Sequence, residues 1–113
     1  MTRVLFADDH PQILASQRQS LRSYRQDWTM EFCLGSQQAL EVLATDSFDV
    51  VVSGTDMVGV QGGQLLDIVR DLYPHSIRIA MGNQTDYEKM FKAISSAHQF
   101  LSGNCPPESL FQA

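Results

Sequence analysis

The sequence has no long hydrophobic run, little positive charge and few cysteines. Apolar stretches such as Val50–Val52 fall far short of the roughly 18 residues that a bilayer-spanning helix needs, and no signal segment opens the chain. Eight lysines and arginines against 13 acidic residues leave a formal net charge of −5, which repels nucleic-acid phosphates. These absences predict a cytoplasmic protein that binds neither membrane nor nucleic acid.

The composition that remains is that of a single folded domain. The chain has 113 residues, of which 43% are hydrophobic and 19% charged, as in average globular proteins. Its two cysteines, Cys33 and Cys105, lack metal-ligand spacing and are expected to be free thiols. The histidines His10 and His98 have no ligand-like partners nearby in sequence and are expected at the surface or in loops.

Short apolar segments alternate with amphipathic ones along the chain. Period-two or wholly apolar patterns predict strands at 3–7, 28–33, 48–53, 77–81 and 99–101. Apolar residues at helical spacing predict helices from Pro11 to about Gln26, from a Ser36 cap to residue 44, from 65 to near Pro74, over 87–94 and from Pro107 onward. Alternating strands and helices predict a parallel sheet covered on both faces, which is a doubly wound α/β fold.

In such a sheet, chemistry is located at the carboxyl ends of the strands. The residues that follow each expected strand are therefore the informative ones, and they are Asp8, Asp9, Gly54 to Met57, Gly82 and Gly103.

These segments resemble the receiver domain of two-component response regulators along the whole chain. Residues 4–11 (VLFADDHP) are similar to the family's opening, and residues 57–62 (MVGVQG) are similar to its Met-Pro-Gly-x-Asp-Gly loop. Residues 100–110 (FLSGNCPPESL) match the end of its fifth strand and the start of its last helix. The resemblance implies a flavodoxin-like (βα)5 sheet with strand order 2-1-3-4-5, and the chain is expected to be the N-terminal part of a longer protein.

The family's chemistry depends on five side chains. Two acids after the first strand help to hold magnesium, and an aspartate after the third strand accepts a phosphoryl group. A serine or threonine after the fourth strand and a lysine after the fifth contact that group. By the resemblance, Asp8 and Asp9 are the acid pair.

Three of those five positions are glycine. Counting back three residues from Met57 puts Gly54 at the acceptor position, and the same register puts Gly82 at the hydroxyl position and Gly103 at the lysine position. The resemblance therefore implies a degenerate receiver with no catalytic residue, no enzyme activity and no required cofactor. Asp8 and Asp9, with Asp56 as a further candidate ligand, are candidates for a weak magnesium site. The alternative that the sequence favours is an acidic loop stabilised by the start of the following helix.

Three functions remain open. The first is a receiver that acts by protein contact, independently of phosphorylation. The second is phosphorylation of a substitute acid such as Asp56, and the third is a small-ligand or nucleotide sensor that uses the emptied pocket. Ser53, next to the acceptor position, should point to the opposite face of the sheet.

The resemblance also implies the kinds of partner. They are an output domain, another receiver or a histidine kinase, and homodimers would form through the fourth helix, fifth strand and fifth helix. Phe100, at the family's aromatic-switch position, is expected to be packed or to face a partner. Residues 97–101 (AHQFL) resemble, more weakly, receivers joined to HDOD or HD-GYP output domains.

Overall fold

The computed structural model describes residues 2–24, 27–54, 65–82 and 99–102. Its strands are β1 (Thr2–Asp8), β2 (Trp28–Leu34), β3 (Val50–Gly54), β4 (Ile77–Gly82) and β5 (Gln99–Ser102). Its helices are α1 (Pro11–Ser20), α2 (Ser36–Thr45) and α3 (Leu65–Leu72), with a short 3-10 turn, η1 (Arg22–Tyr24), after α1. The helices expected at 87–94 and from Pro107 onward lie outside the described residues.

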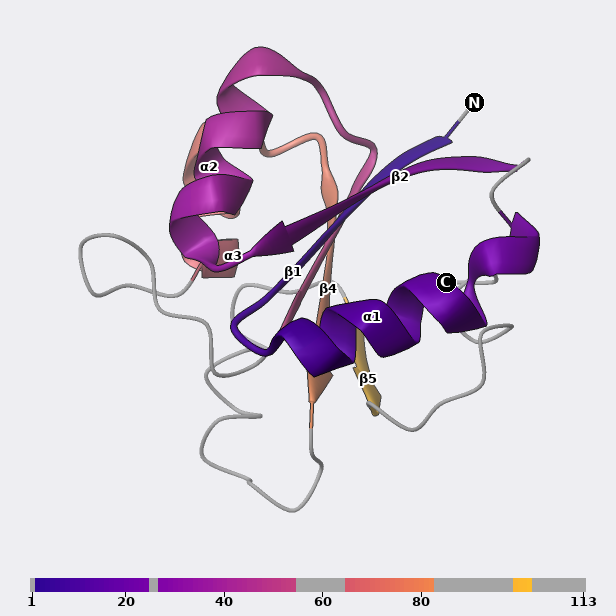
Figure 1. Ribbon diagram of the computed structural model, residues 1–113. Helices are drawn as coiled ribbons and strands as arrows, with labels where there is room; N and C mark the ends of the chain where they lie inside the picture. Colours follow the sequence, from indigo (N-terminus) through magenta and orange to yellow (C-terminus); the bar gives the residue numbers. More distant parts are fainter. Residues whose placement is uncertain (1, 25–26, 55–64, 83–98, 103–113) are drawn as a thin grey trace.

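The strands form one parallel sheet in the order β2-β1-β3-β4-β5 (Figure 1). In the centre of the sheet, Val4 of β1 pairs with Val50 of β3, and Phe6 pairs with Val52. Apolar side chains of the two strands therefore lie next to each other. The predicted doubly wound fold and strand order are confirmed.

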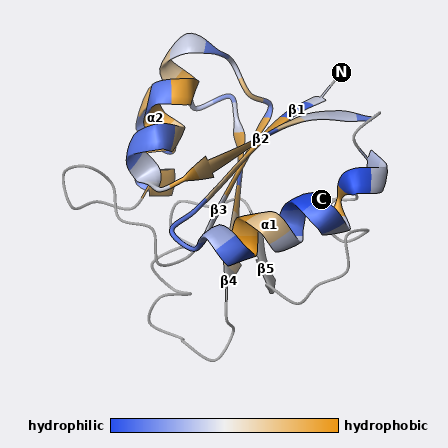
Figure 2. Ribbon diagram, in the orientation of Figure 1, coloured by the Kyte–Doolittle hydropathy of each residue, from blue (hydrophilic) through white to orange (hydrophobic). Residues whose placement is uncertain are grey.

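Each face of the sheet has its own hydrophobic cluster, because consecutive strand residues point to opposite faces. Figure 1 shows α1 on one face of the sheet and α2 and α3 on the other. The cluster under α1 contains Val4, Phe6, Leu14, Leu21, Trp28, Val52 and Ile79. The cluster under α2 and α3 contains Leu5, Ala7, Cys33, Ala39, Leu43, Phe48, Val51, Leu65, Leu66, Val69 and Ala80. The central strands therefore have to be apolar on both sides, as their colours in Figure 2 show.

The first helix is shorter than predicted, since α1 ends at Ser20 and not near Gln26. The chain tightens after it, because the Tyr24 N–H donates to the Leu21 carbonyl at 2.9 Å, an i to i+3 bond. The ring of Tyr24 then stacks on Trp28 with 5.7 Å between centroids. The stacking of Tyr24 on Trp28 at the start of β2 outweighs the helical spacing of the apolar residues in this segment, so the helix ends before Tyr24.

The predicted cap of the second helix is also wrong by one residue. Gly35, not Ser36, is the N-cap of α2, and Ser36 begins the helix without any side-chain capping bond. The φ of Gly35 is +88°, in the left-handed region that glycine adopts without strain. The sharp turn from β2 into α2 therefore depends on the glycine.

The third strand begins at Val50 and not at Phe48. Phe48 is buried just before it, and its carbonyl accepts a 2.6 Å hydrogen bond from the Ser76 hydroxyl.

Among the helices in the described part of the chain, none has the length and apolar character needed to span a bilayer.

Candidate functional site

The carboxyl ends of four strands lie side by side at one edge of the sheet. β1 ends at Asp8, β3 at Gly54, β4 at Gly82 and β5 at Ser102, and Gly82 pairs with Ser102. Asp8, Asp9, Gly54 and Gly82 are hereafter called the strand-end site. It is the edge at which doubly wound sheets carry their chemistry.

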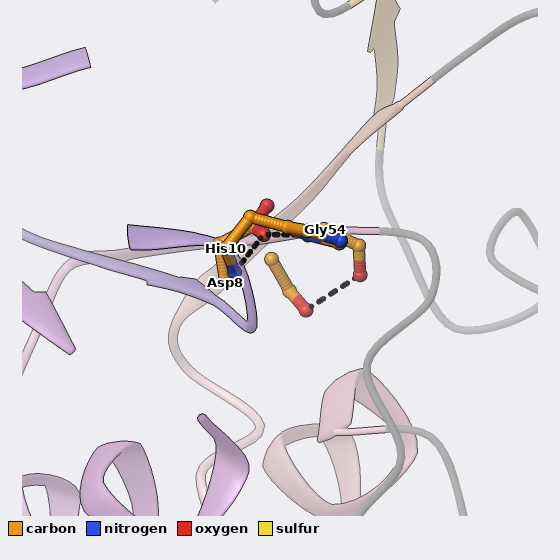
Figure 3. A network of polar contacts seen from close by, with 4 residues as sticks. Asp8, His10 and Gly54 are labelled. Atoms are coloured by element: carbon orange, nitrogen blue, oxygen red, sulfur yellow. Dashed lines mark hydrogen bonds and ion pairs between the residues drawn. The ribbon is translucent and has the colours of Figure 1, made fainter. Parts of the chain in front are cut away.

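Within this site an acid stands opposite a glycine. Phe6 pairs with Val52 in parallel register, so two residues further along Asp8 stands level with Gly54. Paired residues in a parallel sheet share a face. A side chain at position 54 would therefore lie beside Asp8, and Figure 3 shows these two residues together at the ends of their strands.

Asp8 is directed toward the start of α1. Its carboxylate Oδ1 accepts a hydrogen bond from the backbone N–H of His10 at 2.9 Å and contacts Nδ1 of the same ring at 2.9 Å. Asp8 is only 8% exposed, whereas the His10 side chain is about half exposed. His10 is exposed, as expected of a surface histidine, but its contact with Asp8 was not predicted. The Asp-x-His spacing of an Asx turn is the signal that could have revealed the contact.

Asp9 belongs to a different neighbourhood. The Gly35 N–H donates to the carbonyl of Asp8 at 2.9 Å, and a Cβ on Gly35 would lie 3.7 Å from Oδ1 of Asp9. The carboxylate of Asp9 therefore lies beside the start of α2, while that of Asp8 is bonded at the start of α1.

Among the described residues, the donor set at this edge is small for magnesium. Magnesium requires a nearly ideal octahedron of oxygens, usually one or two carboxylates completed by phosphate and water. In the part of the chain that the structure describes, no three His, Cys, Asp or Glu side chains are grouped so as to hold a metal ion. The carboxylates described at the strand-end site are those of Asp8 and Asp9, and the carboxylate of Asp8 is already hydrogen-bonded to His10.

Ser53, next to Gly54, is engaged on the other face. Its register partners Ala7 and Ala80 belong to the cluster under α2 and α3. The hydroxyl donates to the carbonyl of Gly54 at 3.0 Å, and the residue is 2% exposed. The alternation predicted for Ser53 is found, and its hydroxyl is not available to a reactant at the edge.

Several predicted site residues cannot be placed in the same way. Asp56 and Gly103 lie outside the described residues. Phe100 is described through its backbone, which pairs with Ala80 in β5.

Cys33 is a buried thiol in the sheet and not part of the strand-end site. Burial, with a smaller contribution from the charge of Glu31, raises its pKa from 9.0 to about 11. Since the thiolate is the reactive form, Cys33 is unreactive at neutral pH in the folded protein.

The parallel sheet in the order 2-1-3-4-5, with adjacent acids at the end of its β1 strand, defines a flavodoxin-like domain of the receiver class. Residues 4–113 match the pattern of the response regulator receiver domain, and the chain belongs to that family. It is therefore a receiver domain of two-component signalling.

Individual relatives agree with this assignment. The response regulator protein FleR of Pseudomonas aeruginosa is 36% identical over 64 residues, which are 57% of this chain and 13% of that protein. The chain thus spans a small part of that relative's length.

Solved structures show the same fold along nearly the whole chain. The signal receiver domain of an HD domain-containing protein from Pseudomonas fluorescens Pf-5 is 26% identical, with a TM-score of 0.84 over 98% of this chain and 82% of that one. A CheY-like receiver domain protein from Methanospirillum hungatei JF-1 has a TM-score of 0.82 at 19% identity, over 99% of this chain and 89% of that one.

Proposed function

We propose that this receiver domain signals by protein contact and does not accept a phosphoryl group. The observation that carries the proposal is the position of Gly54. It ends β3 level with Asp8, where the resemblance to the family places the aspartate that attacks phosphorus. A glycine has no side chain, so it supplies no oxygen for a bond to the phosphoryl group.

Two further substitutions support the proposal. Gly82, at the end of β4, stands where the family carries the hydroxyl that bonds a phosphoryl oxygen. Gly103 stands where the family carries the lysine that neutralises its charge. Phosphoryl transfer is catalysed mainly by positioning and charge stabilisation. A domain without nucleophile, hydroxyl and lysine has neither the acceptor nor most of these stabilising groups.

The partners proposed for the domain are proteins in the cytoplasm: an output domain, another receiver or a histidine kinase. An HD-type output domain in the same polypeptide is a specific candidate, because a solved receiver at 26% identity comes from an HD domain-containing protein. Homodimers through the surface around β5 remain a prediction by family analogy. The domain would need no cofactor and would not act as an enzyme.

The test is incubation with Mg²⁺ and a small phosphodonor, first acetyl phosphate and then phosphoramidate, followed by intact-mass measurement. A receiver that retains the third-strand aspartate serves as the positive control. We expect the control to gain the mass of one phosphoryl group and this domain to gain none. A hydroxylamine-sensitive adduct on this domain would contradict the proposal.

One variant separates the alternative acceptor from a nonspecific adduct. Asp56 follows Gly54 by two residues and is the substitute acid nearest to the end of β3. If an adduct formed on the wild type and was absent from Asp56→Asn, Asp56 would be the acceptor. An adduct that persists in Asp56→Asn would have to be located by peptide mapping, with Asp8 and Asp9 as the first positions to inspect.

A further inference from the structure

A groove of about 840 Å³ lies between α1 and β2, and Asp8, Asp9 and Gly54 of the strand-end site do not line it. β2 is an edge strand of the sheet, so the groove is located at the border of the molecule. Its helix-side wall consists of Pro11, Leu14, Ala15, Arg18 and Gln19 of α1 and Arg22 of η1. Steps of four and three residues place Pro11, Ala15 and Arg18 on one side of α1.

The floor of the groove is apolar and firmly packed. It contains Met30 and Phe32 of β2. Phe32 stacks on the fully buried Phe6, with 4.8 Å between ring centroids and 9° between the ring planes. Leu34, at the end of the strand, is 49% exposed. Since the ring of Phe32 is fixed by its stacking on Phe6, this part of the groove is already ordered before a ligand binds.

The rim of the groove is positively charged. The guanidinium of Arg18 lies 4.9 Å from the centroid of Phe32, and Arg22, at the start of η1, also lines the groove. Both arginines are exposed. Among the described residues that line the groove there is no aspartate or glutamate, although the whole chain has a net charge of −5. The charge at the rim of the groove is thus positive, opposite to the net charge of the protein.

We propose that this groove binds an acidic, amphipathic segment of a partner protein. Apolar side chains of the segment would pack over Met30 and Phe32, and its carboxylates would pair with Arg18 and Arg22. Guanidinium groups bind carboxylates in a planar, bidentate manner. Charges at a rim also speed association and reject partners of the same sign.

A second copy of the chain fits this groove less well. In a symmetric dimer through the groove, the same patch occurs on both subunits, so the arginines of one copy would face those of the other. An acidic partner meets no such repulsion. The inference goes beyond the proposed function, because it names a surface and a ligand chemistry that do not depend on whether Gly54 is an acceptor position.

The test uses short random peptides displayed on phage. The wild-type domain is the only target of the selection, and the double variant Arg18→Glu/Arg22→Glu is used afterwards, in the affinity measurements. No Mg²⁺ or phosphodonor is present, so the result is separate from the mass measurement above. Affinities of the selected peptides are then measured by fluorescence anisotropy. We expect peptides rich in acidic and apolar residues, whose affinity falls by about tenfold or more in the double variant.

Two single variants make the test specific. Ala15→Gln, a neutral change to another good helix former, narrows the groove and is expected to weaken binding. Arg70→Glu is the matched control for Arg22→Glu: it makes the same change of charge on the exposed side of α3, outside the groove, and should leave binding unchanged. Thermal melts of every variant confirm that the fold is retained.

The proposal is overturned by any of three results. The first is that no groove-dependent peptide is selected, or that the selected peptides lack acidic residues. The second is that Arg18→Glu/Arg22→Glu and Ala15→Gln bind the peptides as tightly as the wild type does. The third is a wild-type dimer in sedimentation that Arg22→Glu dissociates, which would make a second copy the occupant.

Discussion

The interior of the sheet and its carboxyl edge differ in the kind of residue they carry. In the interior, Leu5, Phe6, Val51 and Val52 are at most 1% exposed and fill both faces with apolar side chains. At the edge, the strands end in the acid Asp8 and the glycines Gly54 and Gly82. The interior accounts for the stability of the domain, while the edge contributes little to it. The receiver scaffold can therefore persist when the residues at this edge change.

The largest expected effect comes from the interior. Phe6→Ala removes a fully buried ring that stacks on Phe32 and should lower the free energy of unfolding by about 3–5 kcal/mol. Urea denaturation followed by circular dichroism measures the change. Ile13→Ala is the control, because Ile13 is 41% exposed and should cost at most about 0.5 kcal/mol. Equal losses in the two variants would contradict the assigned core.

The next effect is a pH dependence that also arises in the interior. The pKa of Cys33 is raised to about 11 in the folded protein, so between pH 9 and 11 the unfolded chain loses a proton that the folded chain retains. Stability should therefore fall as pH rises through this window, by about 2–3 kcal/mol from this group. Cys33→Ala should lack this part of the decline. Identical pH profiles for the two proteins would show that the thiol is not buried as described.

At the edge, a smaller change is expected from Asp8. Asp8→Ala removes the acceptor of the His10 N–H bond at 2.9 Å and should cost about 1 kcal/mol. Asp9→Ala serves as its matched control, since Asp9 is exposed and should have almost no effect. Chemical denaturation of both variants gives the comparison. A loss as large as that of Phe6→Ala would mean that the edge is part of the core.

The smallest expected effect tests the site itself. Gly54→Asp places a second carboxylate level with Asp8, and magnesium should then stabilise the variant by about 1 kcal/mol or less at concentrations a few times its Kd. Thermal melts with and without Mg²⁺ measure this difference. The wild type and Gly54→Asn should show no such stabilisation. A magnesium effect equal in all three proteins would indicate that the ion binds elsewhere.

Much of the fold could be predicted from the sequence, because the apolar pattern of each strand is local. The runs around Leu5 and Val51 indicate strands without reference to the rest of the chain, and the alternation in β2 indicates a strand with one apolar face. The end of α1 was mispredicted because Tyr24 is held by Trp28, a tertiary contact that no helical pattern contains. The Ser36 cap was mispredicted because Gly35 adopts a positive φ.

The candidate site was predictable in part for the same reason. Asp8, Gly54 and Gly82 follow apolar runs, so a parallel sheet had to bring them to one edge. The bonding of Asp8 to His10 depends on the turn into α1, and the groove beneath Arg18 depends on the distance between α1 and β2. Both arise from three-dimensional packing, which spacing along the chain does not contain.

The intact mass of the domain after incubation with Mg²⁺ and phosphoramidate shows whether this receiver has a phosphoryl acceptor. We expect the mass to stay that of the unmodified chain, while a receiver with the third-strand aspartate is converted under the same conditions. A stoichiometric phosphoryl adduct that hydroxylamine removes would show that the domain has an acceptor, and its absence from Asp56→Asn would identify that acceptor as Asp56.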